Sequence, residues 1–412
     1  MRRIFKRKRI YLDYAASTPL SAGAHKKMEP YFWVHYGNAG ALHKEGSVAK
    51  QALEEARNDI AHALTARPEE IIFTGSGTET NNLAIIGFME ALKLKKGTLS
   101  GVHVITSSAE HPSVLECFRS FEKEGVTIDM VDFDERGIIN PKEVRALLKK
   151  ETVFVSIAYV NNEIGTVQPI KDIAREIRLH EKEIGTQVAF HTDASQAPLY
   201  FDCTPSHLGV DLMTIDGQKI YGPKGVGFLY KRKGVILEEV MKGGNQEFGL
   251  RPGTENIPLI VGLQVSFTDA VSGRYKEVKE IKALQEFFLA KLKKEVPHAV
   301  LNGDPVLRSP SNINISIPGV DNEYLVIVLD EHGIAAATKS ACLGHGNGEH
   351  SYVVASLYRD KRKHGSEDTD QSIALAKSAV RFSLGKGTTK RDISYVISIL
   401  ANEVKKIDTV EL

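Results

Sequence analysis

The chain has 412 residues, of which 42% are hydrophobic and 25% charged, and its formal net charge at pH 7 is +1. This length favours two domains, and the composition is that of a globular protein rather than a disordered one. A net charge so close to zero argues against direct nucleic-acid binding. The chain also lacks an apolar run of the roughly 18 residues that a membrane-spanning helix needs, so we expect no membrane association.

The cysteine content and the first residues bear on the cellular compartment. Three cysteines, Cys117, Cys203 and Cys342, are too few for a disulfide framework. Six of residues 2–9 are Lys or Arg, but no apolar segment of a secretory signal follows them. We therefore expect a cytoplasmic protein.

Helices and strands alternate along the first two thirds of the chain. Apolar residues at helical spacing predict a helix over 45–64, a short apolar strand follows at 70–74, and residues 75–78 open a second helix. Further strands are expected at 102–106, 126–131, 153–160, 188–191, 210–215 and 225–230, with helices at 113–124, 141–150 and 170–182. Apolar strands separated by helices of this length indicate an α/β fold with a mostly parallel sheet covered on both faces.

The pattern changes after about residue 256. Long helices with charged faces are expected over 259–296, a half-buried strand over 311–317, and an amphipathic helix from 388 onward. Residues 343–350 and 359–371 lack apolar periodicity and are expected to be mobile loops. We predict a large domain over 20–265 and a smaller α+β domain formed by 1–19 together with 266–412.

The most informative residues are Asp193, just after the strand that ends at His191, and Lys219, 26 residues further on in a glycine-flanked turn. Ligands bind at the carboxyl ends of strands in open α/β sheets. Alone, Asp193 would more often be a helix cap than a ligand contact. Together, the two residues favour pyridoxal phosphate chemistry, in which a lysine binds the cofactor aldehyde and a carboxylate keeps the pyridine nitrogen protonated.

Two further segments come after predicted strands. Gly75-Ser-Gly77-Thr78 is either a phosphate cradle at a helix N-terminus or a plain helix cap. His111 comes after the strand at 102–106 and is either a structural histidine or a residue that stacks on a cofactor ring or transfers protons.

Cys342 and Arg381 are the other two candidate functional residues. Three glycines follow Cys342 within six residues, which favours an exposed loop and a nucleophilic thiol over a buried inert one. A metal site with His345 and His350 is a third alternative. Arg381 is either a bidentate partner of a substrate carboxylate or part of a surface ion pair.

Ten ordered blocks give the chain a family resemblance over nearly its whole length. It resembles the cysteine desulfurases of the class V aminotransferase group, within the fold type I pyridoxal phosphate enzymes. This resemblance implies a mostly parallel, seven-stranded-type sheet sandwiched by helices. The blocks are Tyr11–Pro19, Tyr36–Asn38, Gly77–Glu79, Glu110-His111, Val160–Gly165, His191–Gln196, Lys219–Gly225, Arg251–Asn256, Ser340–Cys342 and Arg381–Gly385.

The resemblance also implies roles for site residues. Lys219 binds the cofactor and later acts as a base, Asp193 contacts the ring nitrogen, and His111 stacks on the ring. The other cofactor contacts are expected from Asn162, Gln196, Gly77, Thr78 and Gln218, with Thr254 reaching over from the second subunit of a homodimer. Arg381, with Asn162, is expected to bind the carboxylate of L-cysteine.

The implied reaction leaves L-alanine and a persulfide on Cys342, carried on a loop like that of the subgroup with a mobile catalytic loop. A sulfur-acceptor protein for iron–sulfur cluster assembly or tRNA thiolation would then take the sulfur. No metal is expected. The alternatives are a selenocysteine lyase or another pyridoxal phosphate lyase or aminotransferase of this fold, and a non-catalytic scaffold that binds sulfur-carrier proteins.

Several positions depart from the family pattern, and those next to the cofactor lysine lie in the turn before Lys219. Where Ser-Gly-His-Lys is common, this chain has Asp216-Gly-Gln218-Lys219. Gln218 can still donate a hydrogen bond to a phosphate, but an ionised Asp216 cannot. We expect Asp216 to point away from the phosphate, to pair with a cation such as Lys224, or to lower the affinity for the cofactor.

Overall fold

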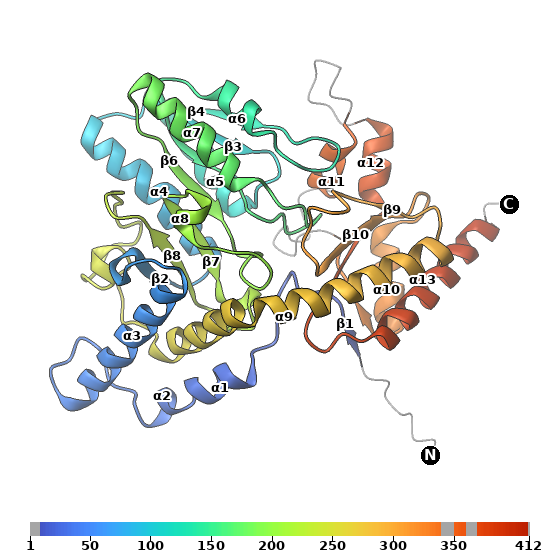
Figure 1. The fold of residues 1–412 in the computed structure, drawn as a ribbon, viewed down its shortest axis with the longest axis horizontal. Helices are drawn as coiled ribbons and strands as arrows, with labels where there is room; N and C mark the ends of the chain where they lie inside the picture. Colours follow the sequence, from blue (N-terminus) through green and yellow to red (C-terminus); the bar gives the residue numbers. More distant parts are fainter. Residues whose placement is uncertain (1–8, 339–349, 360–368, 411–412) are drawn as a thin grey trace.

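The computed structural model describes residues 9–338, 350–359 and 369–410, with side chains as far as residue 406. A seven-stranded sheet forms the larger part (Figure 1), in the order β2-β8-β7-β6-β5-β3-β4. The strands are β2 Ile71–Thr74, β3 His103–Ser107, β4 Thr127–Val131, β5 Thr152–Ser156, β6 Ala189–Asp193, β7 Leu212–Asp216 and β8 Gly227–Lys231. Strands β7, β6, β5, β3 and β4 are parallel, whereas β8 runs antiparallel to both β7 and β2. The predicted α/β class with a mostly parallel sheet is confirmed.

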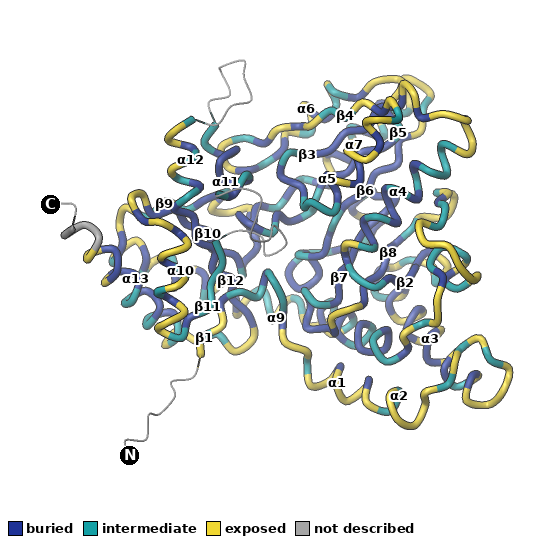
Figure 2. The backbone as a smooth tube through the Cα atoms, turned by 180° about the vertical axis from the view of Figure 1, so that it is seen from behind, coloured by how far each residue is buried: buried dark blue, intermediate teal, exposed yellow. Residues whose placement is uncertain are grey.

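Helices cover both faces of this sheet, and two apolar clusters separate the faces. On one face, side chains of α4 and α5 pack with Ile72, Val104 and Phe154, while on the other face α3, α7 and α9 pack with Phe73, Val155 and Phe190. The central strands are buried as a result (Figure 2). The helices of this part are α1 Ala22–Met28, α2 Pro30–Trp33, α3 Lys44–Ala63, α4 Gly77–Lys96, α5 Pro112–Arg119, α6 Pro141–Leu147, α7 Ile170–Ile184 and α8 Pro205–Leu208.

Some predicted boundaries differ from the structure. Strand β5 ends at Ser156 rather than at residue 160, because Val160 turns back to form an antiparallel bridge with Val167. Helix α5 ends at Arg119, and a separate 3-10 turn spans Glu122–Glu124.

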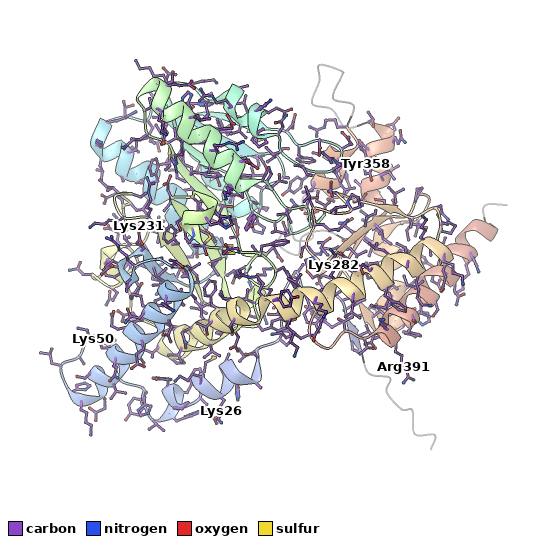
Figure 3. The ribbon with its side chains drawn as sticks, viewed as in Figure 1. Lys26, Lys50, Lys231, Lys282, Tyr358 and Arg391 are labelled. Carbon is purple, nitrogen blue, oxygen red and sulfur yellow. The ribbon has the colours of Figure 1, made fainter. Side chains whose placement is uncertain are left out.

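The smaller part consists of two small sheets and their helices. Strand β1 Ile10–Tyr11 pairs in parallel with β11 Ile334–Ala335, and an antiparallel sheet has the order β12-β10-β9. Its strands are β9 Val300–Leu301, β10 Asn312–Ser316 and β12 Ala379–Ser383, and its helices are α10 Asn322–Glu331, α11 Tyr352–Leu357, α12 Asp370–Lys377 and α13 Lys390–Val410. At the end of α11, Tyr358, labelled in Figure 3, donates a hydrogen bond to Asn302 Oδ1 at 2.7 Å.

Strand β10 is fully buried, so the prediction of a half-buried strand is wrong. Its polar face does not meet water. The amide groups of Asn312 and Asn314 both donate to the carbonyl oxygen of Glu163, each at 3.0 Å. Because buried polar groups are stabilised by such hydrogen bonds, an alternating pattern does not always indicate exposure of the polar face.

A single helix, α9 Ile257–Glu295, replaces the several helices expected over 259–296. It contacts α1 and α3 near one end of the molecule and α13 near the other (Figure 1). The expected domain boundary at residue 265 lies inside this helix, so the division at that point stays a prediction. The loops expected at 343–350 and 359–371 lie mostly outside the described residues, although Asp370 already begins α12. None of the described helices is both long and apolar enough to cross a membrane.

Candidate active site

A cavity of about 290 Å³ lies at the carboxyl ends of β3, β6 and β7. The chain folds this way because parallel strands end at one edge of the sheet and the loops after them converge there. The cavity contains nine of the residues predicted from the sequence: Gly77, Thr78, His111, Asn162, Asp193, Gln196, Gln218, Lys219 and Arg381. They come from the large sheet, from the start of α4 and from β12, so both parts of the molecule contribute.

Lys219 ends a 3-10 turn that comes directly after β7. A Cβ atom on Gly222 would lie 2.7 Å from the Gly217 carbonyl oxygen, and one on Gly217 would lie 2.9 Å from that of Val226. The two glycines therefore allow a turn that no side chain at these positions would permit. The Lys219 ammonium group donates to the carbonyl oxygens of Ala15 and Ala16, at 2.9 and 2.7 Å.

Asp193 is hydrogen-bonded on both carboxylate oxygens. Asn81 donates to Oδ2 at 2.8 Å, and the backbone N–H of Ser195 donates to Oδ1 at 2.9 Å. Gln196, from the same loop, donates to the Ala15 carbonyl oxygen at 2.9 Å, close to the Lys219 contact. Sequence reasoning missed Asn81, although its position one turn after Gly77 on α4 was a signal that it faces the same cavity.

The histidine two residues before Asp193 has a structural role. His191 is completely buried in β6, and its ring nitrogens lie 2.8 Å from Ser156 Oγ and 3.1 Å from Thr214 Oγ1. Burial lowers the pKa of His191, which keeps the ring neutral beneath the cavity.

His111 lines the cavity and is also the N-cap of α5. Its Nδ1 accepts a hydrogen bond from the backbone N–H of Ser113 at 3.1 Å and lies 2.7 Å from Ser113 Oγ. Because Nδ1 is an acceptor, the proton of the neutral ring is on Nε2. His111 can therefore be a structural cap of α5 and also be free to stack on a cofactor ring or to transfer protons.

The start of α4 forms another wall of the cavity. Ser76 is the N-cap, because Ser76 Oγ accepts from the Glu79 N–H at 3.1 Å. The first N–H groups of the helix, on Gly77 and Thr78, have no acceptor within the helix. They therefore offer an anion site inside the cavity.

Asp216 does not point away from this anion site, nor is Lys224 its hydrogen-bond partner. It lines the cavity, and its Oδ2 accepts from the side-chain amide of Gln218 at 3.0 Å. Burial raises the pKa of the Asp216 carboxyl group. Of the three expectations for this residue, a lowered affinity for the cofactor is the one that stays open.

Arg381 is buried, so the alternative of a surface ion pair is wrong. The residue is 1% exposed, and its guanidinium group donates to Asp13 Oδ1 at 2.8 Å and to the Asn162 carbonyl oxygen at 2.9 Å. The Nε atom is buried and has no hydrogen-bond partner among the described residues. A planar group held at the wall of the cavity in this way can bind a carboxylate with directional hydrogen bonds.

Glu110 is a buried carboxyl group that sequence reasoning did not assign to the site. Its Oε1 accepts from the Ala158 N–H at 2.8 Å and from Ser107 Oγ at 3.1 Å. Burial raises the pKa of Glu110 to about 8. Its backbone carbonyl also accepts from the hydroxyl of Tyr352, at the start of α11, which connects the smaller part to the segment that carries His111.

Two predicted residues are not found in this cavity. Thr254 lines a separate cavity of about 170 Å³ together with Arg251, whose Nε donates to Glu79 Oε1 at 2.9 Å. Cys342 lies outside the described residues, as does His345 of the alternative metal site.

The fold and the cavity define an α/β enzyme of the aminotransferase type: residues 10–396 match the aminotransferase class-V family, to which the chain belongs. Within that class, several relatives of the chain are cysteine desulfurases. It is 37% identical over 404 residues to the cysteine desulfurase IscS of Dictyoglomus turgidum, covering 98% of this chain and 96% of the relative.

Solved structures of related proteins share the fold. A NifS-like protein superposes with a TM-score of 0.85 at 28% identity, covering 96% of this chain and 99% of that protein. A structure described as SspA in complex with cysteine has a TM-score of 0.75 at 32% identity, covering 91% of this chain and 98% of SspA.

Proposed function

We propose that this protein converts L-cysteine to L-alanine and transfers the sulfur atom to Cys342. The observation that carries the proposal is the convergence of Lys219, Asp193 and Arg381 on one cavity. A lysine, a carboxylate and a buried guanidinium group in one cavity suit a cofactor that binds an amino acid through its amine and carboxylate. The similarity to SspA, which was solved with cysteine, supports the choice of amino acid.

The residues present fit pyridoxal 5′-phosphate. Lys219 would hold its aldehyde carbon and Asp193 its ring nitrogen, while the start of α4 would bind its phosphate. Gln196, Asn162 and His111 line the cavity between these points and would contact the ring. When bound, the cofactor accepts the electron pair released when the proton leaves Cα of the substrate.

The protein's own groups would then perform distinct steps. Arg381 binds the substrate carboxylate, and Asn162 lines the same wall. The Lys219 amine would remove the proton from Cα of the substrate, and His111, which lines the same cavity, would transfer protons through Nε2.

The sulfur transfer needs no external oxidant. The thiolate of Cys342 attacks the substrate sulfur, a sulfur–sulfur bond forms and the carbon–sulfur bond breaks. The carbon that loses sulfur takes up a proton, which gives alanine and a persulfide on Cys342. A sulfur-acceptor protein of iron–sulfur cluster assembly or tRNA thiolation would take the sulfur from there, in the cytoplasm.

A homodimer is part of the proposal. Five apolar side chains at and after α2 are exposed in the single chain, a concentration that a subunit interface would cover: Phe32, Trp33, Val34, Tyr36 and Leu42. Thr254 would then contact the cofactor phosphate of the partner subunit.

The experiment is a measurement of alanine and sulfide released from L-cysteine in the presence of a reductant. Wild type should form both in equal amounts, and Lys219→Ala should form neither. A matched control is Lys224→Ala, an exposed lysine of the same turn, which should retain activity. Release of alanine from selenocysteine but not from cysteine would favour a selenocysteine lyase, and release from neither substrate would favour a scaffold.

A further inference from the structure

Two carboxyl groups line the active-site cavity, at the ends of the adjacent strands β6 and β7. Asp193 lies at the end proposed for the ring nitrogen. Asp216 lies at the other end, against the start of α4: a Cβ atom placed on Gly77 would be 3.0 Å from Asp216 Cβ and 3.2 Å from Asp216 Oδ2. A phosphate bound at the N-terminus of α4 therefore meets Asp216 as a direct neighbour.

The surroundings of Asp216 do not compensate a negative charge well. The residue is 7% exposed, and both hydrogen bonds it accepts come from uncharged groups of Gln218: the side-chain amide at 3.0 Å and the backbone N–H at 3.3 Å. The charged groups that act on it are Lys219, which favours ionisation, and Asp193, which opposes it. The first turn of α4 carries one charged side chain, Glu79, whose carboxylate accepts from the Gly75 N–H at 2.9 Å and from Arg251 Nε at 2.9 Å. The paired residue of β8, Gly227, adds no side chain.

An ionised carboxylate and a neighbouring phosphate group repel one another, although the N-terminus of α4 attracts anions. A neutral carboxyl group has the opposite effect, because it carries one O–H donor and one acceptor oxygen. Burial, which raises the pKa of Asp216, lowers the cost of that neutral form.

We propose that Asp216 takes up a proton from solvent when a phosphate binds at the start of α4, an inference that rests on the proposed function. The hydroxyl of the neutral carboxyl then donates a hydrogen bond to the phosphate, while its other oxygen still accepts from Gln218. Asp216 is thereby a phosphate-binding residue whose protonation is linked to binding.

This linkage has a direction. When binding takes up one proton, the affinity for the ligand falls by up to about tenfold for each unit by which the pH rises. This holds over the pH range in which the free protein has lost the proton and the complex keeps it. Asp216→Asn keeps the shape of the neutral carboxyl group and needs no proton. The variant should therefore bind phosphorylated ligands more tightly than wild type at high pH, without this part of the pH dependence.

The test uses 4-deoxypyridoxine 5′-phosphate, which has the ring and the phosphate but no aldehyde that could react with Lys219. Its dissociation constant is measured by calorimetry with the cofactor-free full chain over a range of pH, in two buffers of different ionisation enthalpy so that protons are counted. Ionisation of the ligand itself is the same for every variant. Asp172→Asn, at an exposed carboxylate of α7, is the matched control, and Asp216→Ser is a second neutral variant if Asp216→Asn does not fold.

We expect wild type and Asp172→Asn to take up more protons than Asp216→Asn or Asp216→Ser, and to lose affinity more steeply as pH rises. Equal proton uptake and parallel pH profiles in all variants, with pyridoxal phosphate still bound, would overturn the inference and leave the proposed function intact. Failure of every variant to bind pyridoxal phosphate would overturn both.

Discussion

Glu110 illustrates how burial changes what a single residue does. It precedes His111 at the cavity, yet its carboxyl group is buried and its hydrogen bonds to Ala158 and Ser107 go to Oε1 alone. Oε2 has no hydrogen-bond partner among the described residues. A protonated carboxyl group suits this environment, because an uncompensated buried charge is costly.

Glu110 should therefore make stability depend on pH. The unfolded carboxyl group loses its proton near pH 4.5, whereas the folded one keeps it until about pH 8. Unfolding releases a proton between these values, so the free energy of unfolding falls as pH rises through this window. Glu110→Gln should remove this contribution, which is at most about 1.4 kcal/mol per pH unit.

Urea denaturation of both proteins at several pH values across the window measures this effect. Glu116→Gln, at an exposed position on α5, is the control and should behave like wild type. A constant difference in free energy between Glu110→Gln and wild type at every pH would contradict the prediction.

Residues of the cavity differ in how far the sequence predicts them. Asp193 and Lys219 are predictable because each lies just after or at the end of a strand, and the loops after parallel strands meet at one edge of the sheet. Asn81 and Glu110 are not, because their contacts depend on the rotation of α4 and on the depth of burial.

Among the elements, the start of α4 forms one wall of the cavity, and Gly77 lies against Asp216 there. A side chain there would press on Asp216 at 3.0 Å. Gly77→Ala should weaken pyridoxal phosphate binding by about tenfold or more, because one hydrogen bond to a charged group contributes about 1.5–3 kcal/mol. Fluorescence titration of the cofactor-free protein measures this change.

Gly273→Ala in α9 is the matched control, because among the described residues no atom other than those of its chain neighbours and of the adjoining helix backbone lies within 4 Å of the added methyl group. It should stabilise the protein by about 0.5–1 kcal/mol without altering cofactor binding. Equal cofactor affinity of Gly77→Ala and wild type would show that α4 does not begin at the phosphate.

The elements also show where pattern reasoning succeeds and where it does not. Runs of apolar residues predicted the strands of the large sheet because six of the seven are buried on both faces, and only the edge strand β4 is partly exposed. The alternating pattern wrongly predicted that β10 is half-buried, because a sequence pattern does not show that the amides of Asn312 and Asn314 donate to the Glu163 carbonyl oxygen. The sequence pattern also predicted several helices where the structure has only α9. The reason is that charged and apolar stretches alternate along this helix as it passes from one part of the molecule to the other.

At the scale of the whole molecule, α9 joins the two parts and the cavity lies where they meet, with Arg381 supplied by β12 and Lys219 by the turn after β7. The exposed apolar segment around α2 lies at the far end of the larger part (Figure 1). Such a segment is what a symmetric dimer would bury.

The dimer is testable in solution. Wild type should have twice the mass of one chain by size-exclusion chromatography with light scattering, and Trp33→Glu should shift toward the monomer, because a charge would be buried in the interface. Leu94→Glu, at an exposed leucine on α4, should remain dimeric. A monomeric wild type, or equal masses for wild type and Trp33→Glu, would contradict the dimer.

The most direct test of the central claim is mass spectrometry of the protein after reaction with L-cysteine in the absence of a reductant. We predict that the peptide containing Cys342 gains the mass of one sulfur atom, that alanine forms in the same amount, and that Cys117 and Cys203, which are buried, gain none. Formation of alanine in the Cys342→Ser variant at the wild-type rate, or an unmodified Cys342 in wild type after alanine has formed, would contradict the account.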